Sequence, residues 1–164
     1  MQIRSLCSTE VSLHRALRLR ALKDTPDAFA ESFEEVAARP MSYWEALTQS
    51  VTASGQHVMF LASIDEEVYG CTYGLLDSKQ DDAARVGGMW VDPSQRKRGL
   101  GGALLKAVVL WAYEQQRTHM GLWAPTNHPE AVALYRRAGF VETGDIKPFP
   151  NQPSLQIMAM TLKL

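Results

Sequence analysis

Residues that build disulfide frameworks and metal centres are scarce in this chain. It holds two cysteines, Cys7 and Cys71, which are too few for a disulfide framework. Its four histidines are scattered along the sequence, so no Cys/His cluster has the spacing of metal ligands. We therefore expect neither a disulfide framework nor a bound metal.

Long apolar runs and an excess of one charge are missing as well. No stretch of about 18 apolar residues is present, which argues against a membrane span, and residues 1–11 lack the apolar region of a signal peptide. The 17 basic and 18 acidic residues give a formal net charge of -1, so nothing draws the whole protein to nucleic acid or an anionic membrane. We expect a cytoplasmic protein with neither of these partners, and any anion site must be local.

What is present fits one globular domain over residues 1–164, with 46% hydrophobic and 21% charged residues and no internal repeat. Apolar periodicity and turn residues place the elements along the chain. Strands are expected at residues 1–6, 57–64, 68–76, 85–91, 119–124, 140–142 and 155–162, and helices at 11–22, 42–49, 101–116 and 129–137. Strands that first form a meander and then alternate with helices predict a mixed sheet in an α/β or α+β domain.

The segment between the strand ending at Val91 and the helix starting near Gly101 has the features of an anion site. Its residues 95–102 read QRKRGLGG. The glycines let successive backbone N–H groups turn toward one point, and the helix N-terminus adds unpaired N–H groups and a positive dipole end. Three consecutive basic residues strengthen the local field, so a pyrophosphate is the expected ligand.

Two better-known phosphate motifs do not fit this segment. A P-loop needs Lys and then Ser or Thr after its last glycine, but Ala103 follows Gly102. The dinucleotide fingerprint G-x-G-x-x-G needs Gly or Ala where the chain has Leu104. The remaining alternative is a Gly-rich turn with a solvated basic run.

Two motifs resemble those of the GNAT (GCN5-related) N-acetyltransferases. Arg96-x-x-Gly99-x-Gly101, preceded by Val91-Asp92-Pro93, resembles the acetyl-CoA motif of that family, and residues 127–140, NHPEAVALYRRAGF, resemble its second signature. Together they span residues 89–140. The resemblance implies the GNAT acyl-CoA N-acyltransferase fold, a mixed, mostly antiparallel sheet of about six or seven strands flanked by about four helices.

The resemblance also implies the site residues and the cosubstrate, acetyl-CoA. Tyr135 stands where the family places a tyrosine near the coenzyme sulfur, so its implied role is to donate a hydrogen bond or proton to the leaving thiolate. Asn127 resembles the family's coenzyme-contacting asparagine. Tyr135 lies eight positions after it, where a spacing of seven is common in the family. The implied coenzyme contacts are Met89, Trp90, Val91, Arg96, Lys97, Arg98, Gly99, Leu100, Gly101, Gly102 and Asn127. In the family, the strand before the Gly-rich turn splays away from its neighbour. In the strand expected at residues 85–91, Gly87-Gly88 suggests a bulge that is consistent with such splaying.

The general base is where the chain departs from the family. Some members carry a Glu at the position of Arg85, and others place one where this chain has Leu122 nearby. The alternatives are a water chain or a side chain from the set Glu31, Glu34, Glu35 and His119. Aromatic residues that could line an acceptor pocket, or simply pack in the core, are Phe29, Phe33, Trp44 and Tyr73. The proline-rich residues 147–153 are expected to form a rigid loop over the acceptor.

Three functions remain open from the sequence. The first is an N-acetyltransferase that acts on a small primary amine by direct attack, and the acidic segment 28–38 favours a cationic amine. The second is a protein acetyltransferase acting on a lysine or an N-terminus. The third is a non-catalytic domain that binds acetyl-CoA. The resemblance to the GNAT family also implies a possible homodimer through the C-terminal strands.

Overall fold

A seven-stranded sheet in the order β1-β2-β3-β4-β5-β7-β6 forms the centre of the molecule. The computed structural model describes residues 1–77, 82–150 and 152–164. The strands are β1 (Gln2–Ser5), β2 (His57–Ile64), β3 (Glu67–Leu76), β4 (Ala83–Val91), β5 (His119–Pro125), β6 (Val141–Phe149) and β7 (Gln152–Lys163). The only parallel pair in the described part of this sheet is β4 with β5. The expected mixed, mostly antiparallel sheet is therefore confirmed.

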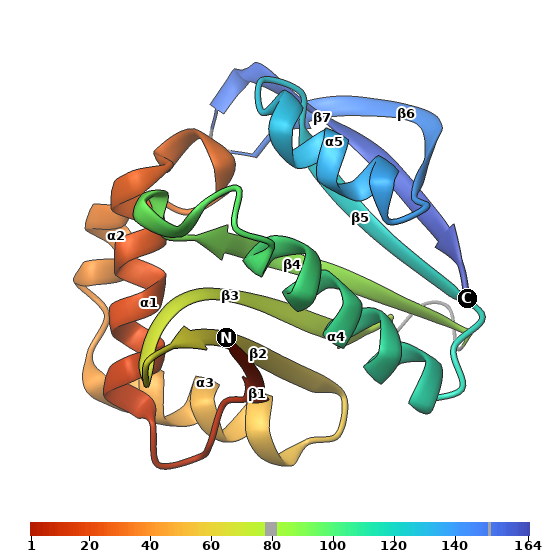
Figure 1. Ribbon diagram of the computed structural model, residues 1–164. Coiled ribbons are helices and arrows are strands. Elements are labelled where there is room, and N and C mark those ends of the chain that lie inside the picture. The colour runs from red at the N-terminus through yellow and green to blue at the C-terminus, as the bar shows by residue number, and fades with distance from the viewer. Residues whose placement is uncertain (78–81, 151) are drawn as a thin grey trace.

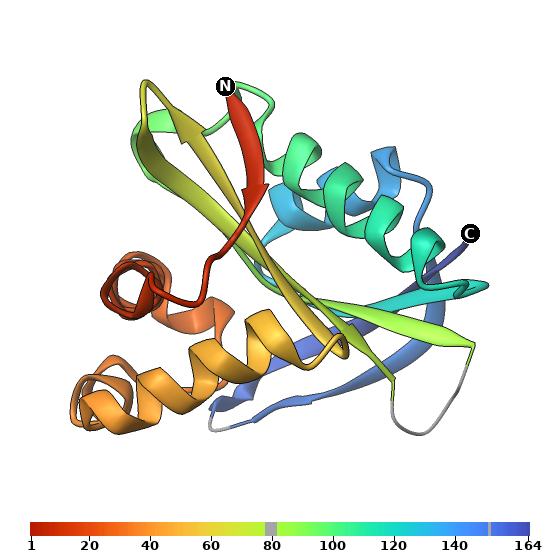
Figure 2. The same ribbon diagram turned by 90° about the horizontal axis from the view of Figure 1, so that it is seen from below.

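Helices cover both faces of the sheet (Figures 1 and 2). They are α1 (Val11–Asp24), α2 (Phe33–Ala37), α3 (Met41–Ala53), α4 (Leu100–Glu114) and α5 (Pro129–Arg137). Figure 2 shows α4 and α5 on one face and α1, α2 and α3 together on the other. One apolar core lies between α4, α5 and strands β4, β5 and β7, and another lies between α1 to α3 and strands β2 to β4. Burial of these two faces is what fixes the layers.

Three expectations differ from the structure. The helix expected at 42–49 continues to Ala53, and the five-residue α2 was not expected as a helix. The strand expected at 140–142 continues to Phe149, and its partner already begins at Gln152. Pairing with β7 draws these polar residues into the sheet, because each added strand residue satisfies its backbone groups in the ladder. The polar loop expected at 78–82 lies mostly outside the described residues.

Strands β4 and β5 separate soon after they start, and this opening determines where a ligand can enter. They pair only at Ala83↔His119, Ala84↔Met120 and Arg85↔Gly121, and then diverge (Figure 1). The register between β3 and β4 shifts in the same region, which confirms the bulge expected at Gly87-Gly88. Gly88 has a φ of 58°, and a Cβ there would lie 2.5 Å from the Tyr73 ring. Only glycine allows this bend beside that ring.

His14, on α1, is the most deeply buried polar ring in the core beneath β3. Its Nδ1 lies 2.9 Å from Thr48 Oγ1, and its Nε2 lies 2.7 Å from Tyr73 Oη. Burial, with a smaller contribution from the charge of Arg18, lowers the pKa of His14 from 6.5 to about 4. The imidazole is therefore neutral in the folded protein at neutral pH.

We expect this pKa shift to make stability depend on pH between 4 and 6.5. In that window the unfolded chain binds a proton at His14 that the folded chain does not, so the free energy of unfolding falls as the pH drops. From pH 7 to pH 5 the loss should be about 2 kcal/mol by urea denaturation. The His14→Gln variant should lose this dependence. An identical pH dependence in the variant would assign the effect to carboxylates instead.

Candidate active site

The turn between β4 and α4 presents a row of unpaired backbone amides. Lys97 has a φ of 60° and Gly99 a φ of 90°, so the chain turns twice through left-handed conformations before the helix begins. The first turn of α4 holds no acidic residue and no side-chain cap. Among the described residues, no acceptor binds the amides of residues 97–102. Four free N–H groups at a helix start, next to such a turn, form a cradle for an anion.

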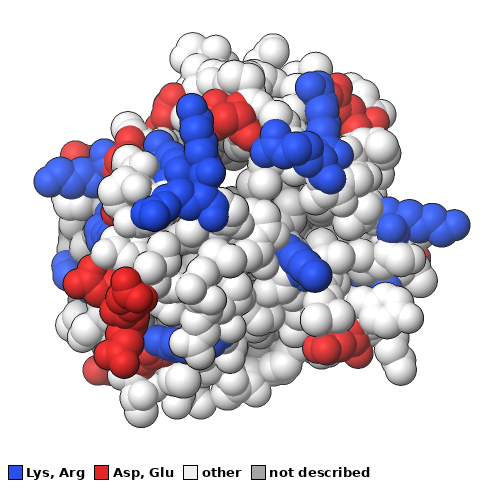
Figure 3. Space-filling view, viewed as in Figure 1, with Lys and Arg blue, Asp and Glu red and all other residues white. Residues whose placement is uncertain are grey.

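Charged side chains surround this cradle. Figure 3 shows Lys and Arg gathered over the start of α4 and again over α5. Arg96 does not point freely at a ligand, because its Nε donates to Val91 O at 2.9 Å and its guanidinium contacts the Asp24 carboxylate. Arg98 donates to Gln95 Oε1 at 2.6 Å. The fold thus uses Arg96 to hold the turn, while the amides of residues 97–102 have no acceptor among the described residues.

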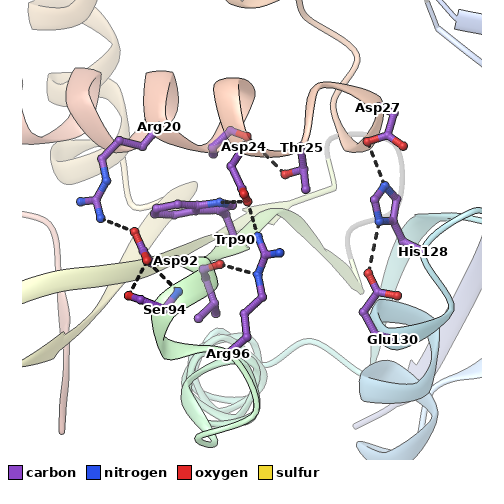
Figure 4. Close-up of polar contacts among 12 residues, drawn as sticks. Arg20, Asp24, Thr25, Asp27, Trp90, Asp92, Ser94, Arg96, His128 and Glu130 are labelled. Atoms are coloured by element: carbon purple, nitrogen blue, oxygen red, sulfur yellow. Dashed lines mark hydrogen bonds and ion pairs between the residues drawn. The ribbon is translucent and has the colours of Figure 1, made fainter.

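Two carboxylates from α1 and the turn itself fix this loop (Figure 4). Asp24 Oδ2 also accepts a hydrogen bond from Trp90 Nε1 at 2.9 Å. Asp92 accepts from the Ser94 amide at 3.0 Å and forms an ion pair of 2.7 Å with Arg20. The Trp90 side chain is buried, and those of Met89 and Val91 are partly buried against a core cluster, so the backbone of this stretch is what can face a ligand. Beyond Arg85, no described strand pairs with the edge of β4 that faces β5.

On the other side of the opening, Asn127 and His128 meet the short helix η1 (Pro26–Ala28). Asn127 Nδ2 donates to Asp27 Oδ2 at 2.6 Å, and His128 Nε2 lies 3.2 Å from Asp27 Oδ1. His128 Nδ1 lies 3.3 Å from Glu130, so the imidazole stands between two carboxylates (Figure 4). Asn127 is therefore at the opening, as its implied role requires, but its amide is held by Asp27.

Tyr135 occupies the helix that packs beside the opening. Its ring contacts Phe140 edge to face at 6.0 Å between centroids, and burial raises the pKa of its phenol to about 12. No hydrogen bond to a described residue engages its hydroxyl group, and burial alone accounts for the pKa shift. The phenol is thus protonated at neutral pH and has a donor to offer. This arrangement is compatible with the implied role of Tyr135, which stays a prediction.

The carboxylates considered as bases are mostly engaged elsewhere. Glu31 forms ion pairs with Arg18 at 2.7 Å and Arg39 at 2.6 Å. Burial alone would raise the pKa of Glu31, but hydrogen bonds from the two arginines hold it below its ordinary value. Glu35 caps α2 through the Ser32 amide at 3.1 Å. These contacts remove Glu31 and Glu35 as free bases and neutralise much of the expected acidic lining.

The remaining candidates differ in their positions. Glu34 lines a hollow of about 460 Å³ between the end of α1, α2 and the start of β7. His119 begins β5 at the end where β4 and β5 are still paired, beside Asp82 at 3.6 Å. Trp44 is buried against His14, so it belongs to the core. The two positions at which the resemblance would place a glutamate thus hold Arg85 and Leu122. A water chain remains open as the base.

The proline-rich residues 147–153 do not form the expected loop. Lys147, Pro148 and Phe149 end β6, and Gln152 and Pro153 begin β7, so the segment is the tip of a hairpin. Asn151, which falls within it, lies outside the described residues. Gln152 Nε2 donates to Pro26 O at 2.8 Å, so the hairpin touches the same helix η1 that meets Asn127. The expected loop is therefore mostly strand, whereas its position over the acceptor stays a prediction.

Residues 1–77, 82–150 and 152–164 hold no group of three or more His, Cys, Asp or Glu side chains that could bind a metal. Within the same residues, no helix is both long and apolar enough to cross a membrane. The candidate site therefore consists of the amide cradle, the opening between β4 and β5, and the side chains around it.

Sequence comparison places this site in a known family. Residues 55–142 match the family model described as the acetyltransferase (GNAT) domain. An uncharacterised N-acetyltransferase of Methanocaldococcus jannaschii is 32% identical over 66 residues, and the match spans 40% of this chain but 29% of that relative.

Solved structures show the same fold at low identity. A ribosomal-protein-alanine N-acetyltransferase from Brucella melitensis has a TM-score of 0.82 at 16% identity, with 100% of both chains covered. A putative acetyltransferase from Salmonella typhimurium, solved with acetyl-CoA, has a TM-score of 0.81 at 17% identity over 100% of this chain and 94% of that one. The spermidine N-acetyltransferase from Vibrio cholerae, solved with CoA and spermine, has a TM-score of 0.79 at 16% identity over 99% of this chain and 94% of that one. These structures support the fold, and the family model covers more than half of the sequence. The chain belongs to the GNAT family of acetyltransferases.

Proposed function

We propose that this protein transfers the acetyl group of acetyl-CoA to a primary amine of a small molecule by direct attack. The observation that carries the proposal is the opening between β4 and β5, with the amide cradle of residues 97–102 at its end. The cradle suits the pyrophosphate of the coenzyme. The free edge of β4 at Met89, Trp90 and Val91 suits its pantetheine arm, and Asn127 stands across the opening.

The chemistry asks little of the side chains beyond positioning and proton movement. Acetyl-CoA supplies a thioester carbon for attack by the neutral amine. A backbone N–H on the free edge of β4 can donate to the carbonyl oxygen as it gains negative charge. The amine loses one proton and the coenzyme sulfur gains one, so the reaction is balanced without an outside acid.

Tyr135 is the donor that we assign to the sulfur. A phenol with a pKa of about 12 is a weaker acid than a thiol of about 8.5. Full proton transfer from Tyr135 to a thiolate is therefore unfavourable, whereas a hydrogen bond to it is favourable. Tyr135 would stabilise the leaving thiolate while the proton of the amine reaches the sulfur.

A protein acceptor is the second candidate, since GNAT structures of the same fold include an enzyme named for a ribosomal-protein alanine as well as one named for spermidine. The contacts that helix η1 makes around the opening favour a small acceptor. Asp27 and Pro26 contact Asn127 and Gln152, which narrows the space over the opening. A non-catalytic acetyl-CoA-binding domain is the third candidate.

Thiol release from acetyl-CoA across a panel of amines and peptides tests the proposal. We expect turnover with at least one small amine and tight binding of acetyl-CoA by calorimetry. Failure to bind acetyl-CoA would refute the proposal as a whole. Preference for peptides over free amines would refute the small-molecule acceptor, and binding without turnover of any amine would favour the non-catalytic domain.

A further inference from the structure

A groove of about 360 Å³ lies on the sheet face that α4 and α5 do not cover. Figure 2 shows α1, α2 and α3 over one half of this face, and leaves the half formed by β5, β7 and β6 bare. The groove is lined by residues of β4, β5, β6 and β7 and by the residue that follows β3. Its polar or aromatic members are Asp77, Arg85, His119, Trp123, Thr143 and Thr161.

The groove begins where β4 and β5 separate. Arg85↔Gly121 is the last pair between these strands, and Gly87 and Trp123, two residues further along, line one end of the groove. The amide cradle follows β4 at the far end of the opening, so an arm running from it along Met89, Trp90 and Val91 would reach Gly87. The reacting carbon would then face this end of the groove, and the acceptor would come from the other face of the sheet.

The charges that the groove exposes are positive. Arg85 contacts Asp77 Oδ2 through Nε at 2.7 Å and Nη2 at 2.6 Å. The Asp77 side chain is 8% exposed and that of Arg85 is 53% exposed, so the guanidinium covers the carboxylate. Among the described residues that line the groove, Asp77 is the only carboxylate.

A second cation lies over Trp123, one of the residues that line the groove. Lys147 Nζ lies 3.8 Å from the centroid of the Trp123 ring, which is 37% exposed. Lys147 pairs with Ile157 on β7, and Trp123 pairs with Ala159 on the same strand, so both side chains stand on the groove face. None of the ion pairs among the described residues involves Lys147. Its ammonium group is free to take an anion.

We propose that the acceptor is an amino-carboxylate, with its amine toward Gly87 and its carboxylate on Lys147. This inference rests on the proposed function and narrows its substrate class. The carboxylate gains a charge-assisted hydrogen bond from Lys147, and the hydrocarbon part of the acceptor packs on Trp123. Arg85 covers the one carboxylate among the described lining residues, so the groove shows the acceptor no negative charge. A polyamine would place cations beside Lys147 and Arg85 without a free carboxylate to pair with.

Matched acceptors test the proposal directly. The kcat/KM values of a panel of α- and β-amino acids are compared with those of their carboxamides, which keep the amine and lack the charge, and with that of spermidine. We expect the wild-type protein to prefer the amino acid by at least tenfold on the best pair. Lys147→Gln should lower this preference about tenfold through KM, Lys147→Glu should reverse it, and Lys147→Arg should keep it.

The two proposals fail in different ways. If amines are acetylated but carboxamides or spermidine are used as well as amino acids, or if Lys147→Gln leaves the preference unchanged, the amino-carboxylate site is wrong and the acetyltransferase proposal stands. If no amine is acetylated, the occupancy of the groove is still measurable. Amino acids added with CoA should quench the fluorescence of Trp123, and the Trp123→Phe variant should lose that component. No quenching in the wild-type protein, or equal quenching in both proteins, would refute the groove as a binding site.

Discussion

Replacing Tyr135 with phenylalanine is expected to lower kcat about 100-fold while the affinity for acetyl-CoA stays unchanged. The change removes only the hydroxyl group, which makes no hydrogen bond to a described residue, and keeps the ring packed against Phe140. A group that acts on the leaving thiolate contributes in the transition state and not in the bound ground state. The measurement is steady-state thiol release together with calorimetric titration of acetyl-CoA.

Tyr113 provides the matched control for this variant. It is also a tyrosine on a helix of the α4 and α5 face, but its side chain is 67% exposed and lies outside the proposed site. Tyr113→Phe should leave kcat unchanged. Thermal unfolding should show that Tyr135→Phe is as stable as the parent, because no hydrogen bond in the described structure is lost. A wild-type kcat in the stable Tyr135→Phe protein would reduce Tyr135 to a packing residue.

The elements that the sequence predicts well are those with local signals at both ends. Helix α5 was expected at residues 129–137 and is found there, because Pro129 suits a first helical position and Gly139, with a φ of 95°, suits the end. Helix α2 was missed although its signal is local. Ser32 and Glu35 have the spacing of a capping box, and each does bond the backbone of the other.

The contacts that shape the site are not local and could not be predicted in the same way. Asp27 stands 100 residues before Asn127, and Asp24 stands 72 residues before Arg96. In the sequence, Thr25-Pro26-Asp27 indicates only the end of a helix. Which distant donors its carboxylate meets depends on the crossing of α1 over the sheet, which no periodicity encodes. The same holds for Arg85, since its cover over Asp77 requires the pairing of β3 with β4.

The extent of the last hairpin was hidden for a related reason. Residues 141–149, VETGDIKPF, carry a glycine, a proline and charges that are typical of a loop. They form a strand because β7 offers a complete partner, and the register shifts twice along the pair to accommodate them. Lys147 reaches Trp123 only as a consequence of this pairing. The candidate acceptor groove is thus a product of tertiary structure.

Replacing Gly102 with aspartate is expected to weaken the binding of acetyl-CoA about 1000-fold without destabilising the fold. A Cβ at Gly102 would meet no atom within 4 Å, so the side chain fits. An acidic residue in the first turn of α4 interacts favourably with the helix dipole, and replacing glycine with another residue improves helix propensity. The melting temperature should therefore stay equal or rise.

The loss of affinity follows from charge in the cradle. A carboxylate about 4 Å from the pyrophosphate repels it by about 4 kcal/mol at the effective dielectric constant of a protein surface, which is about three orders of magnitude in affinity. Gly102→Asn, which has the same shape without the charge, should lose far less. Calorimetric titration and thermal melts of the two variants separate the effects. Wild-type affinity in Gly102→Asp would mean that the amides of residues 97–102 do not bind the coenzyme, because no anion could then lie beside the start of α4.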